Sequence, residues 1–238
     1  MDNTKVFLTA GWRKLALAQY AVDKEILLNY LPPHTILDDW QGKYYVSLVG
    51  FMFVDVKLLG FNIPFHTNFE EVNLRFYVKY KADGAWKRGV VFIKEFVPKR
   101  AITFVANTLY KENYQTLPMK HLWVEQEHQL EVAYHWKNKG WNDFTVVAEP
   151  KAEEILTDSE EEFITEHYWG YTKIGSNTTS EYGVEHPRWK AYPVKNYTIN
   201  VDFGINYGSD FAFLNHAKPD SVMLAEGSEI RVLKGKKF

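Results

Sequence analysis

Strict alternation of polar and apolar positions marks residues 69–80, FEEVNLRFYVKY, as a β-strand. Side chains point to opposite faces at successive positions of a strand. One face is apolar and consists of Val72, Leu74, Phe76 and Val78. The other face consists of Glu71, Asn73, Arg75 and Tyr77. Since the apolar face already supplies what a sheet needs to bury, the polar face either meets water or lines a cavity.

Runs rich in β-branched and aromatic residues predict that most of the chain is strand. The predicted strands lie near 44–56, 71–82, 85–97, 130–136, 143–149, 167–174, 197–203, 210–214 and 221–233. Helices are fewer: Asp23 caps KEILLNYL, Thr157 with Glu160 forms a capping box for DSEEEFITEH, and a short helix is expected around 107–115. No internal repeat or flexible linker interrupts the chain, so a single domain over 1–238 is expected.

A two-residue turn is predicted at Asp83-Gly84, between two strand-like runs. If these residues form the loop, counting back gives the cross-strand pairs Tyr77–Val90, Arg75–Phe92, Asn73–Lys94 and Glu71–Phe96. These eight side chains would share one face. A mixture of charged and aromatic residues favours a cavity, while a solvated charged face is the alternative.

The charged residues on this face predict that Arg75 binds an anion. Glu71 and Arg75 are four residues apart, roughly 13 Å along a strand, which is too far for easy pairing. Lys94 would lie diagonal to Glu71 and could pair with it. Arg75 would then be left to bind an anion from another strand or from a ligand.

Composition excludes several classes of function. The 238 residues carry a formal net charge of -2, without the basic surplus that nucleic-acid binding needs, and no nucleic-acid partner is expected. There is no cysteine, so thiolate catalysis and cysteine-containing zinc sites are excluded. The longest uncharged apolar stretch, 44–54, is far short of the ~20 residues of a spanning helix. Without a signal peptide or membrane segment, a cytoplasmic location and no membrane partner are expected.

No metal or cofactor is predicted from the motifs. His121, His128 and His135 recur at seven-residue intervals, but in a strand-and-loop region that spacing separates them. No phosphate-binding glycine loop or dinucleotide fingerprint occurs. The expected partner is a small-molecule ligand or substrate, and self-association into a homo-oligomer stays open.

Several motifs in order carry a resemblance to a known family. LPPHTILDDWQGKYYVSLVGF, NFEEVNLRFYVKY, GVVFIKEF, HYWGYT and VEHPRWKAYPV look like the successive motifs of the YqjF-like family of uncharacterised bacterial proteins, over about residues 12–195. That family is placed in the acetoacetate decarboxylase-like superfamily. The resemblance implies a mostly β, closed antiparallel β-barrel with a central cavity and a few peripheral helices.

The more distant resemblance to acetoacetate decarboxylase implies a catalytic lysine. Pro98-Lys99-Arg100 is similar to the Pro-Lys-Lys segment that carries the Schiff-base lysine of that enzyme, with Lys99 at the nucleophile's place and Arg100 at the second cation's. A lysine with the reference pKa of about 10.4 is almost entirely protonated at neutral pH, so burial or a neighbouring cation such as Arg100 must lower the pKa of Lys99. The decarboxylase also has pocket carboxylates, and neither Glu71 nor Glu95 matches them cleanly.

These residues support two functional hypotheses. In the first, a lyase acts on small β-keto acids: Lys99 forms an imine that accepts electrons during loss of carbon dioxide, Arg75 orients the carboxylate, and Lys94 is a rival nucleophile. In the second, a non-catalytic barrel binds a small apolar or anionic metabolite. The remaining candidate ligand contacts are Asn73, Tyr77, Phe92, His167 and Tyr171. As an alternative, His167 is a structural residue. The alternative for Lys99-Arg100 is a solvent-exposed pair without a catalytic role.

Overall fold

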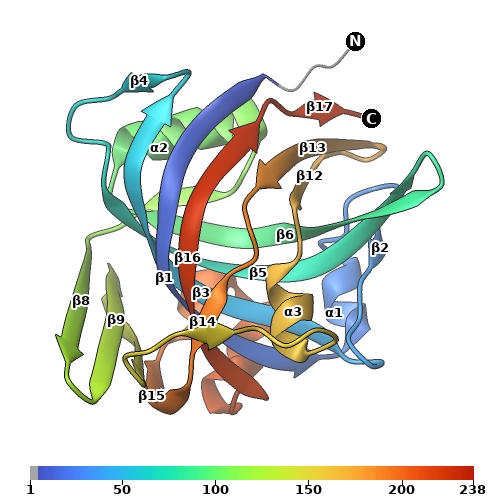
Figure 1. The fold of residues 1–238 in the computed structure, drawn as a ribbon. Coiled ribbons are helices and arrows are strands. Elements are labelled where there is room, and N and C mark those ends of the chain that lie inside the picture. Colours follow the sequence, from blue (N-terminus) through green and yellow to red (C-terminus); the bar gives the residue numbers. More distant parts are fainter. Residues whose placement is uncertain (1–4) are drawn as a thin grey trace.

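The computed structural model describes residues 5–238 and is mostly β-sheet, as the sequence predicts (Figure 1). The long strands are β1 (Val6–Val22), β3 (Tyr44–Leu58), β5 (Phe69–Ala82), β6 (Ala85–Val97), β8 (Met119–Gln126), β9 (Gln129–Asn138), β10 (Gly140–Ala148), β12 (Trp169–Gly175), β13 (Thr178–Glu185), β15 (Val194–Asn200) and β16 (Ser221–Leu233). The short strands are β2 (Ile36–Leu37), β4 (Phe61–Asn62), β7 (Tyr114–Thr116), β11 (Glu153–Glu154), β14 (Lys190–Tyr192) and β17 (Lys236–Lys237).

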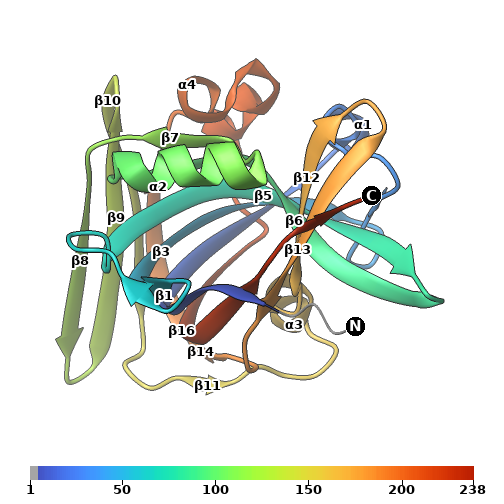
Figure 2. The ribbon, with the colours of Figure 1, turned by 90° about the horizontal axis from the view of Figure 1, so that it is seen from above.

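Helices are short and lie outside the sheets. They are α1 (Lys24–Leu28), α2 (Arg100–Val105) with a π-helical continuation (Ala106–Tyr110), α3 (Glu160–Thr165), α4 (Phe203–Tyr207) and a 3₁₀ segment (Ser209–His216). Figure 2 shows α2 beside β7, along one edge of the curved main sheet. No helix between residues 5 and 238 is long and apolar enough to cross a membrane.

The main sheet follows the order β16-β1-β3-β5-β6-β12-β13, and β13 pairs again with β16 through Val184–Val232 and Glu185–Arg231. The pairings along this circuit are antiparallel, except that β12 runs parallel to β6 at Trp169–Gly89 and Gly170–Val90. The sheet is therefore mostly antiparallel, and this parallel seam brings together strands from distant parts of the chain.

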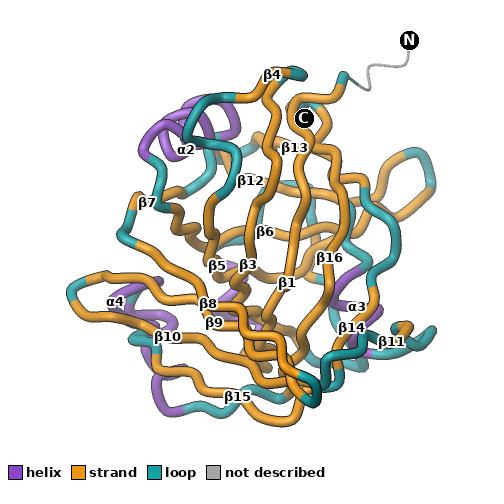
Figure 3. The backbone as a smooth tube through the Cα atoms, turned by 60° about the vertical axis from the view of Figure 1, so that its left-hand side comes forward, coloured by secondary structure: helices purple, strands orange, loops and turns teal. Residues whose placement is uncertain are grey.

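A second sheet, β15-β10-β9-β8, packs against the outer face of the main sheet (Figure 3). Tyr134 and Trp136 of this sheet share a core with Leu74 and Phe76 of β5. Gly50 permits the contact, because an added Cβ there would lie 2.7 Å from the Tyr134 ring. The apolar face of residues 69–80 is thus buried between two sheets, and its polar face points to the inside of the main sheet.

The predicted hairpin turn is confirmed, but a bulge changes the register beyond it. Asp83 and Gly84 both have positive φ, as a type I′ turn requires, and Arg75 still pairs with Phe92. Between Leu74 and Arg75 the ladder shifts by one residue. A shift of one residue reverses the face of every later side chain.

Three predicted positions are therefore corrected. Lys94 pairs with Leu74, on the face that meets the second sheet, and Glu95 pairs with Asn73 on the inner face. Phe96 pairs with Val72 and joins the outer core, so the predicted pairs Asn73–Lys94 and Glu71–Phe96 are wrong.

Other element predictions were also corrected. Residues 210–214 are 3₁₀ helix and not strand, since Phe211 and Leu214 bury at a helical spacing. The side chain of Ser159 caps α3 in place of Thr157, by accepting from the Glu162 N–H. The helix expected at 107–115 begins earlier, at Arg100, and ends at Tyr110. Of the long strands, β1, β8 and β13 were not predicted.

Candidate functional site

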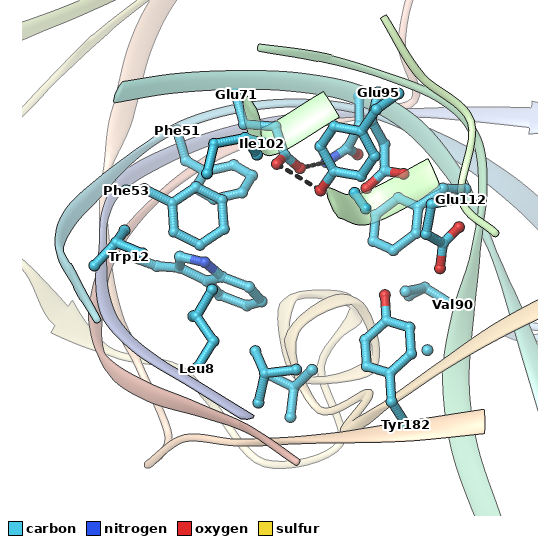
Figure 4. Close-up of a pocket in the computed structure, with 18 of the residues that line it drawn as sticks. Leu8, Trp12, Phe51, Phe53, Glu71, Val90, Glu95, Ile102, Glu112 and Tyr182 are labelled. Atoms are coloured by element: carbon cyan, nitrogen blue, oxygen red, sulfur yellow. Dashed lines mark hydrogen bonds between the residues drawn. The ribbon is translucent and has the colours of Figure 1, made fainter. Parts of the chain in front are cut away.

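A cavity of about 300 Å³ lies on the inner face of the main sheet. Every strand of the circuit contributes lining residues, and Ile102 and Val105 of α2 add to the wall. Figure 4 shows that the wall has two chemically different sides. Leu8, Trp12, Phe51 and Phe53 make up an apolar side.

Three buried carboxyl groups, Glu71, Glu95 and Glu112, gather on the other side, and we call them the carboxyl cluster (Figure 4). They come from β5, from β6 and from the turn before β7. Their hydrogen-bond partners differ. Glu71 accepts from Asn73 Nδ2 (3.0 Å) and from Tyr114 Oη (2.9 Å), and Glu112 accepts from Thr172 Oγ1 (2.6 Å).

Burial raises the pKa of all three carboxyl groups. The pKa of Glu71 and that of Glu112 each rise to about 7, because desolvation outweighs the hydrogen bonds that stabilise their ionised forms. The pKa of Glu95 rises well above its usual range through burial and then through repulsion from Glu112 and Glu71. The cluster therefore holds protons near neutral pH that exposed carboxylates would have released, a feature common at functional sites.

Two tyrosines complete this side of the cavity. Burial and the neighbouring carboxylates raise the pKa of Tyr114 and of Tyr182 well above the usual value, so both hydroxyls stay protonated. Tyr114 is held in place by Asn107 of the π-helical segment, whose side chain donates to the Tyr114 carbonyl (2.9 Å) and accepts from its N–H (2.8 Å). A π-helical turn is often found beside functional residues.

Several buried polar atoms of the lining have no hydrogen-bond partner among the described residues. The acceptors are Asn73 Oδ1, Glu95 Oε2 and His167 Nδ1, and the donors are Arg75 Nε and Trp12 Nε1. A native interior satisfies nearly all of its buried polar atoms, so each exception needs an explanation. Their common location on residues that line the cavity is consistent with a ligand that supplies the partners.

His167 connects the cavity to a buried ion cluster centred on Asp38. Asp38 accepts from Lys79 (2.9 Å), Arg88 (2.7 Å) and His167 Nε2 (3.2 Å). Burial alone would raise the pKa of Asp38, but these hydrogen bonds hold that pKa well below its usual range. Burial lowers the pKa of His167 to about 4. The neutral imidazole therefore donates from Nε2 and turns the acceptor Nδ1 away from Asp38.

The structure brings about half of the sequence-predicted site residues into the cavity lining: Glu71, Asn73, Arg75, Phe92 and His167. Tyr77 is on the inner face but lies beneath the lining, where its ring packs 4.7 Å from that of His167. Tyr171 is buried in the outer core and donates to Glu181 (3.1 Å).

None of the residues predicted to take part in imine chemistry, Lys94, Lys99 and Arg100, lines the cavity. Lys99 is the half-buried N-cap residue of α2, and Arg100, the first residue of that helix, is exposed. Lys94 is on the outer face because of the bulge, and Glu71 accepts from Asn73 and Tyr114. Among the described residues that line the cavity there is no lysine.

Sequence reasoning missed Glu95, Glu112, Tyr114 and Tyr182 as parts of the site. Glu95 was assigned to the opposite face by a regular register, and no local pattern announces the bulge. Tyr182 lies in the stretch GSNTTSEYG, whose polar residues are typical of a connection, but from Thr178 onward this stretch belongs to β13. Glu112 lies inside the helix predicted at 107–115, and nothing in that pattern directs its side chain toward a cavity.

Comparisons with known proteins agree on the family and on the fold. A family model for DUF2071, described as an uncharacterized conserved protein, matches residues 9–229. The uncharacterized protein YqjF of Bacillus subtilis (strain 168) is 25% identical over 221 residues, which cover 89% of this chain and 88% of YqjF.

Solved structures with the same fold are much more distant in sequence. Acetoacetate decarboxylase from Legionella pneumophila superposes with a TM-score of 0.65 at 12% identity, covering 100% of this chain and 90% of that one. An acetoacetate decarboxylase-like enzyme from Sphingomonas wittichii RW1 gives 0.63 at 10% identity, covering 100% and 94%. The fold is thus of the acetoacetate decarboxylase-like type.

Proposed function

Because this chain belongs to the DUF2071 family and has the acetoacetate decarboxylase-like fold, we propose that it binds a small molecule inside the main sheet, with the apolar part of the ligand against Trp12, Phe51 and Phe53 and a polar group at the carboxyl cluster. The single observation that carries this proposal is the set of buried polar atoms without a hydrogen-bond partner on residues that line a largely apolar cavity. In this proposal the seven strands of the circuit act as a closed barrel. The protein then needs no covalent chemistry to function.

Burial energetics favour a binding role over a purely structural one. Three carboxyl groups packed together in an apolar interior lower stability, because each must stay protonated or carry an incompletely solvated charge. Apolar residues of similar size would stabilise the fold better at these positions. A ligand that uses the cluster explains why the interior contains it.

The proposal is tested by calorimetric titration with a panel of small aromatic and aliphatic alcohols, amines and acids. The variant Ile102→Trp places a large ring in the cavity and should weaken binding of any bound member by about tenfold or more. Phe104→Trp is the matched control, since Phe104 is on the same helix and 70% exposed. Absence of binding by every member, or binding that Ile102→Trp leaves unchanged, contradicts the proposal.

A second candidate is a lyase that acts on small β-keto acids through an imine at Lys99. Support comes from the Pro98-Lys99-Arg100 segment, and from Ala101 and Ile102, which lie two and three residues after Lys99 and belong to the cavity wall. In this mechanism the Lys99 amine forms an imine with the ketone and releases water, and the protonated imine takes up the electron pair as carbon dioxide leaves. The enamine then takes a proton at carbon, and water hydrolyses the imine to free the product and the lysine. Arg75 would hold the substrate carboxylate.

Borohydride trapping with acetoacetate, followed by intact mass measurement and peptide mapping, tests this second candidate. An adduct present in the wild type and in Lys94→Ala but lost in Lys99→Ala supports it. An adduct that follows Lys94 would move the chemistry to β6. Absence of any adduct rejects imine formation and leaves the binding proposal as it stands.

A further inference from the structure

Hydrogen-bond acceptors without partners mark one point of the cavity wall. Asn73 and Glu95 are cross-strand neighbours in β5 and β6, a relation that places their Cβ atoms about 5 Å apart. Each residue is only 1% exposed, and Asn73 Oδ1 and Glu95 Oε2 have no partner among the described residues. A ligand group that donates two hydrogen bonds at this point satisfies both atoms.

The charged groups around Asn73 and Glu95 favour a cationic hydrogen-bond donor over a neutral one. Glu71 and Glu112 approach from β5 and from the turn before β7, and the charges of both raise the pKa of Glu95. A buried cation is stable only beside a counter-charge. The carboxyl cluster can supply that counter-charge, because one of its three carboxyl groups can release a proton and become a carboxylate. Side chains that cannot ionise could not do this.

The other groups that face the cluster do not reverse this preference. Arg75, two residues from Asn73, is the only arginine or lysine among the described lining residues, so carboxyl groups outnumber it by three to one. Tyr114 and Tyr182 face the cluster from β7 and β13 and remain neutral. An anionic ligand beside the cluster would require all three carboxyl groups to stay protonated.

We infer that the cavity takes a primary amine in its protonated form, with the ammonium group against Asn73 and Glu95 and a small apolar body between Trp12, Phe51 and Phe53. This inference rests on the proposed function and narrows its ligand class. The ammonium group has three donors, two for the unpartnered acceptors and one for a neighbouring carboxylate. Charge-assisted hydrogen bonds of this kind are about twice as strong as neutral ones.

Proton release accompanies binding. The amine enters as R–NH₃⁺ and keeps its protons, while one carboxylic acid of the cluster becomes a carboxylate and gives its proton to the solvent. No covalent bond to the ligand forms or breaks. Amine affinity should therefore increase as the pH rises from 5 to 8, by up to about tenfold per pH unit while the cluster holds the proton.

Three probes with similar apolar bodies test the head group: phenethylamine, phenethyl alcohol and hydrocinnamate. Calorimetric titration at pH 6 and at pH 8, in two buffers of different ionisation enthalpy, measures affinity and proton release together. We expect the amine to bind at least about tenfold more tightly than the alcohol at pH 8, with up to about one proton released at pH 6. The alcohol should release none.

Glu95→Gln keeps the shape of the side chain and removes its charge. It should weaken amine binding by at least about tenfold more than it weakens alcohol binding, because only the amine loses a charge-assisted hydrogen bond. Glu70→Gln is the matched control, because Glu70 precedes Glu71 on β5 but pairs with His121 (2.7 Å) outside the cavity. It should change neither affinity.

Failure of this inference is distinguishable from failure of the proposed function. If the alcohol or hydrocinnamate binds as tightly as the amine, and Ile102→Trp abolishes that binding, the cavity binds ligands but the amine assignment is wrong. Amine binding without proton release, or insensitive to Glu95→Gln, overturns the assignment as well. If none of the three probes binds and the wider panel also fails, the binding proposal itself is rejected.

Discussion

Asp38 has a buried carboxylate that is surrounded by two cations and one imidazole. It is 5% exposed, and Lys79 and Arg88 reach it from β5 and β6. Its side chain therefore links the strands on either side of the hairpin to His167 at the cavity wall. Removing one partner from a buried ion pair costs much more than the pair itself contributes, because the remaining charges stay unpaired.

We expect Asp38→Ala to lower the free energy of unfolding by about 2–4 kcal/mol at neutral pH, toward the lower end since Lys79 and Arg88 reach partly into solvent. Chemical denaturation measures it. Lys43→Ala breaks the surface pair with Asp220 (3.0 Å) and should cost less than about 1 kcal/mol. Equal losses in the two variants would show that the Asp38 cluster is no stronger than a surface pair.

At single positions, sequence reasoning succeeded where one strand alone decided the outcome. The inward direction of Glu71, Asn73 and Arg75 follows from alternation within β5 and was predicted. Glu95 was misplaced because its direction depends on how two strands pair, and the bulge reverses it. The carbonyl of Ile93 in the bulge accepts from Asn113 Nδ2 (2.9 Å), a contact between segments that no local pattern encodes.

Between elements, the seam of β6 and β12 is a close approach of two strands of the main sheet. Gly89 makes it possible, since an added Cβ would lie 2.4 Å from the Trp169 carbonyl oxygen. The contact joins residues 80 positions apart, so the sequence predicted both strands but not their parallel pairing. The same holds for β13 and β16, whose contact completes the circuit around the cavity.

We expect Gly89→Ala to destabilise the protein by about 2 kcal/mol or more, because backbone atoms must move apart to admit the methyl group. Trp169 and Gly170 line the cavity, so ligand binding should weaken as well. Urea denaturation and the titrations above measure both effects. Gly140→Ala is the control, since nothing lies within 4 Å of its added Cβ, and it should change stability by less than about 0.5 kcal/mol. If the Gly89→Ala protein is as stable as this control, the backbones of β6 and β12 are not closely packed at Gly89.

For the molecule as a whole, the buried titratable groups give opposing dependences of stability on pH. Glu71, Glu95 and Glu112 have raised pKa values, so between pH 5 and pH 7 the folded state keeps protons that the unfolded state releases. Each such group reduces stability by up to about 1.4 kcal/mol per pH unit as the pH rises. His167 and His186 have lowered pKa values and act in the opposite sense, but only below the unfolded pKa of about 6.5.

Three carboxyl groups against two imidazoles leave a net loss of stability as the pH rises, and above pH 6.5 the carboxyl groups act almost alone. We therefore expect the free energy of unfolding to fall by about 1 kcal/mol or more per pH unit between pH 6 and pH 7.5, as measured by chemical denaturation. Glu95→Gln removes one group that binds a proton and should make this slope shallower, while Glu127→Gln, whose side chain is 88% exposed, should leave it unchanged. A wild-type protein whose stability increases with pH over this range would show that the carboxyl cluster is ionised when folded. The cavity would then carry a standing negative charge, and amine binding would release no proton.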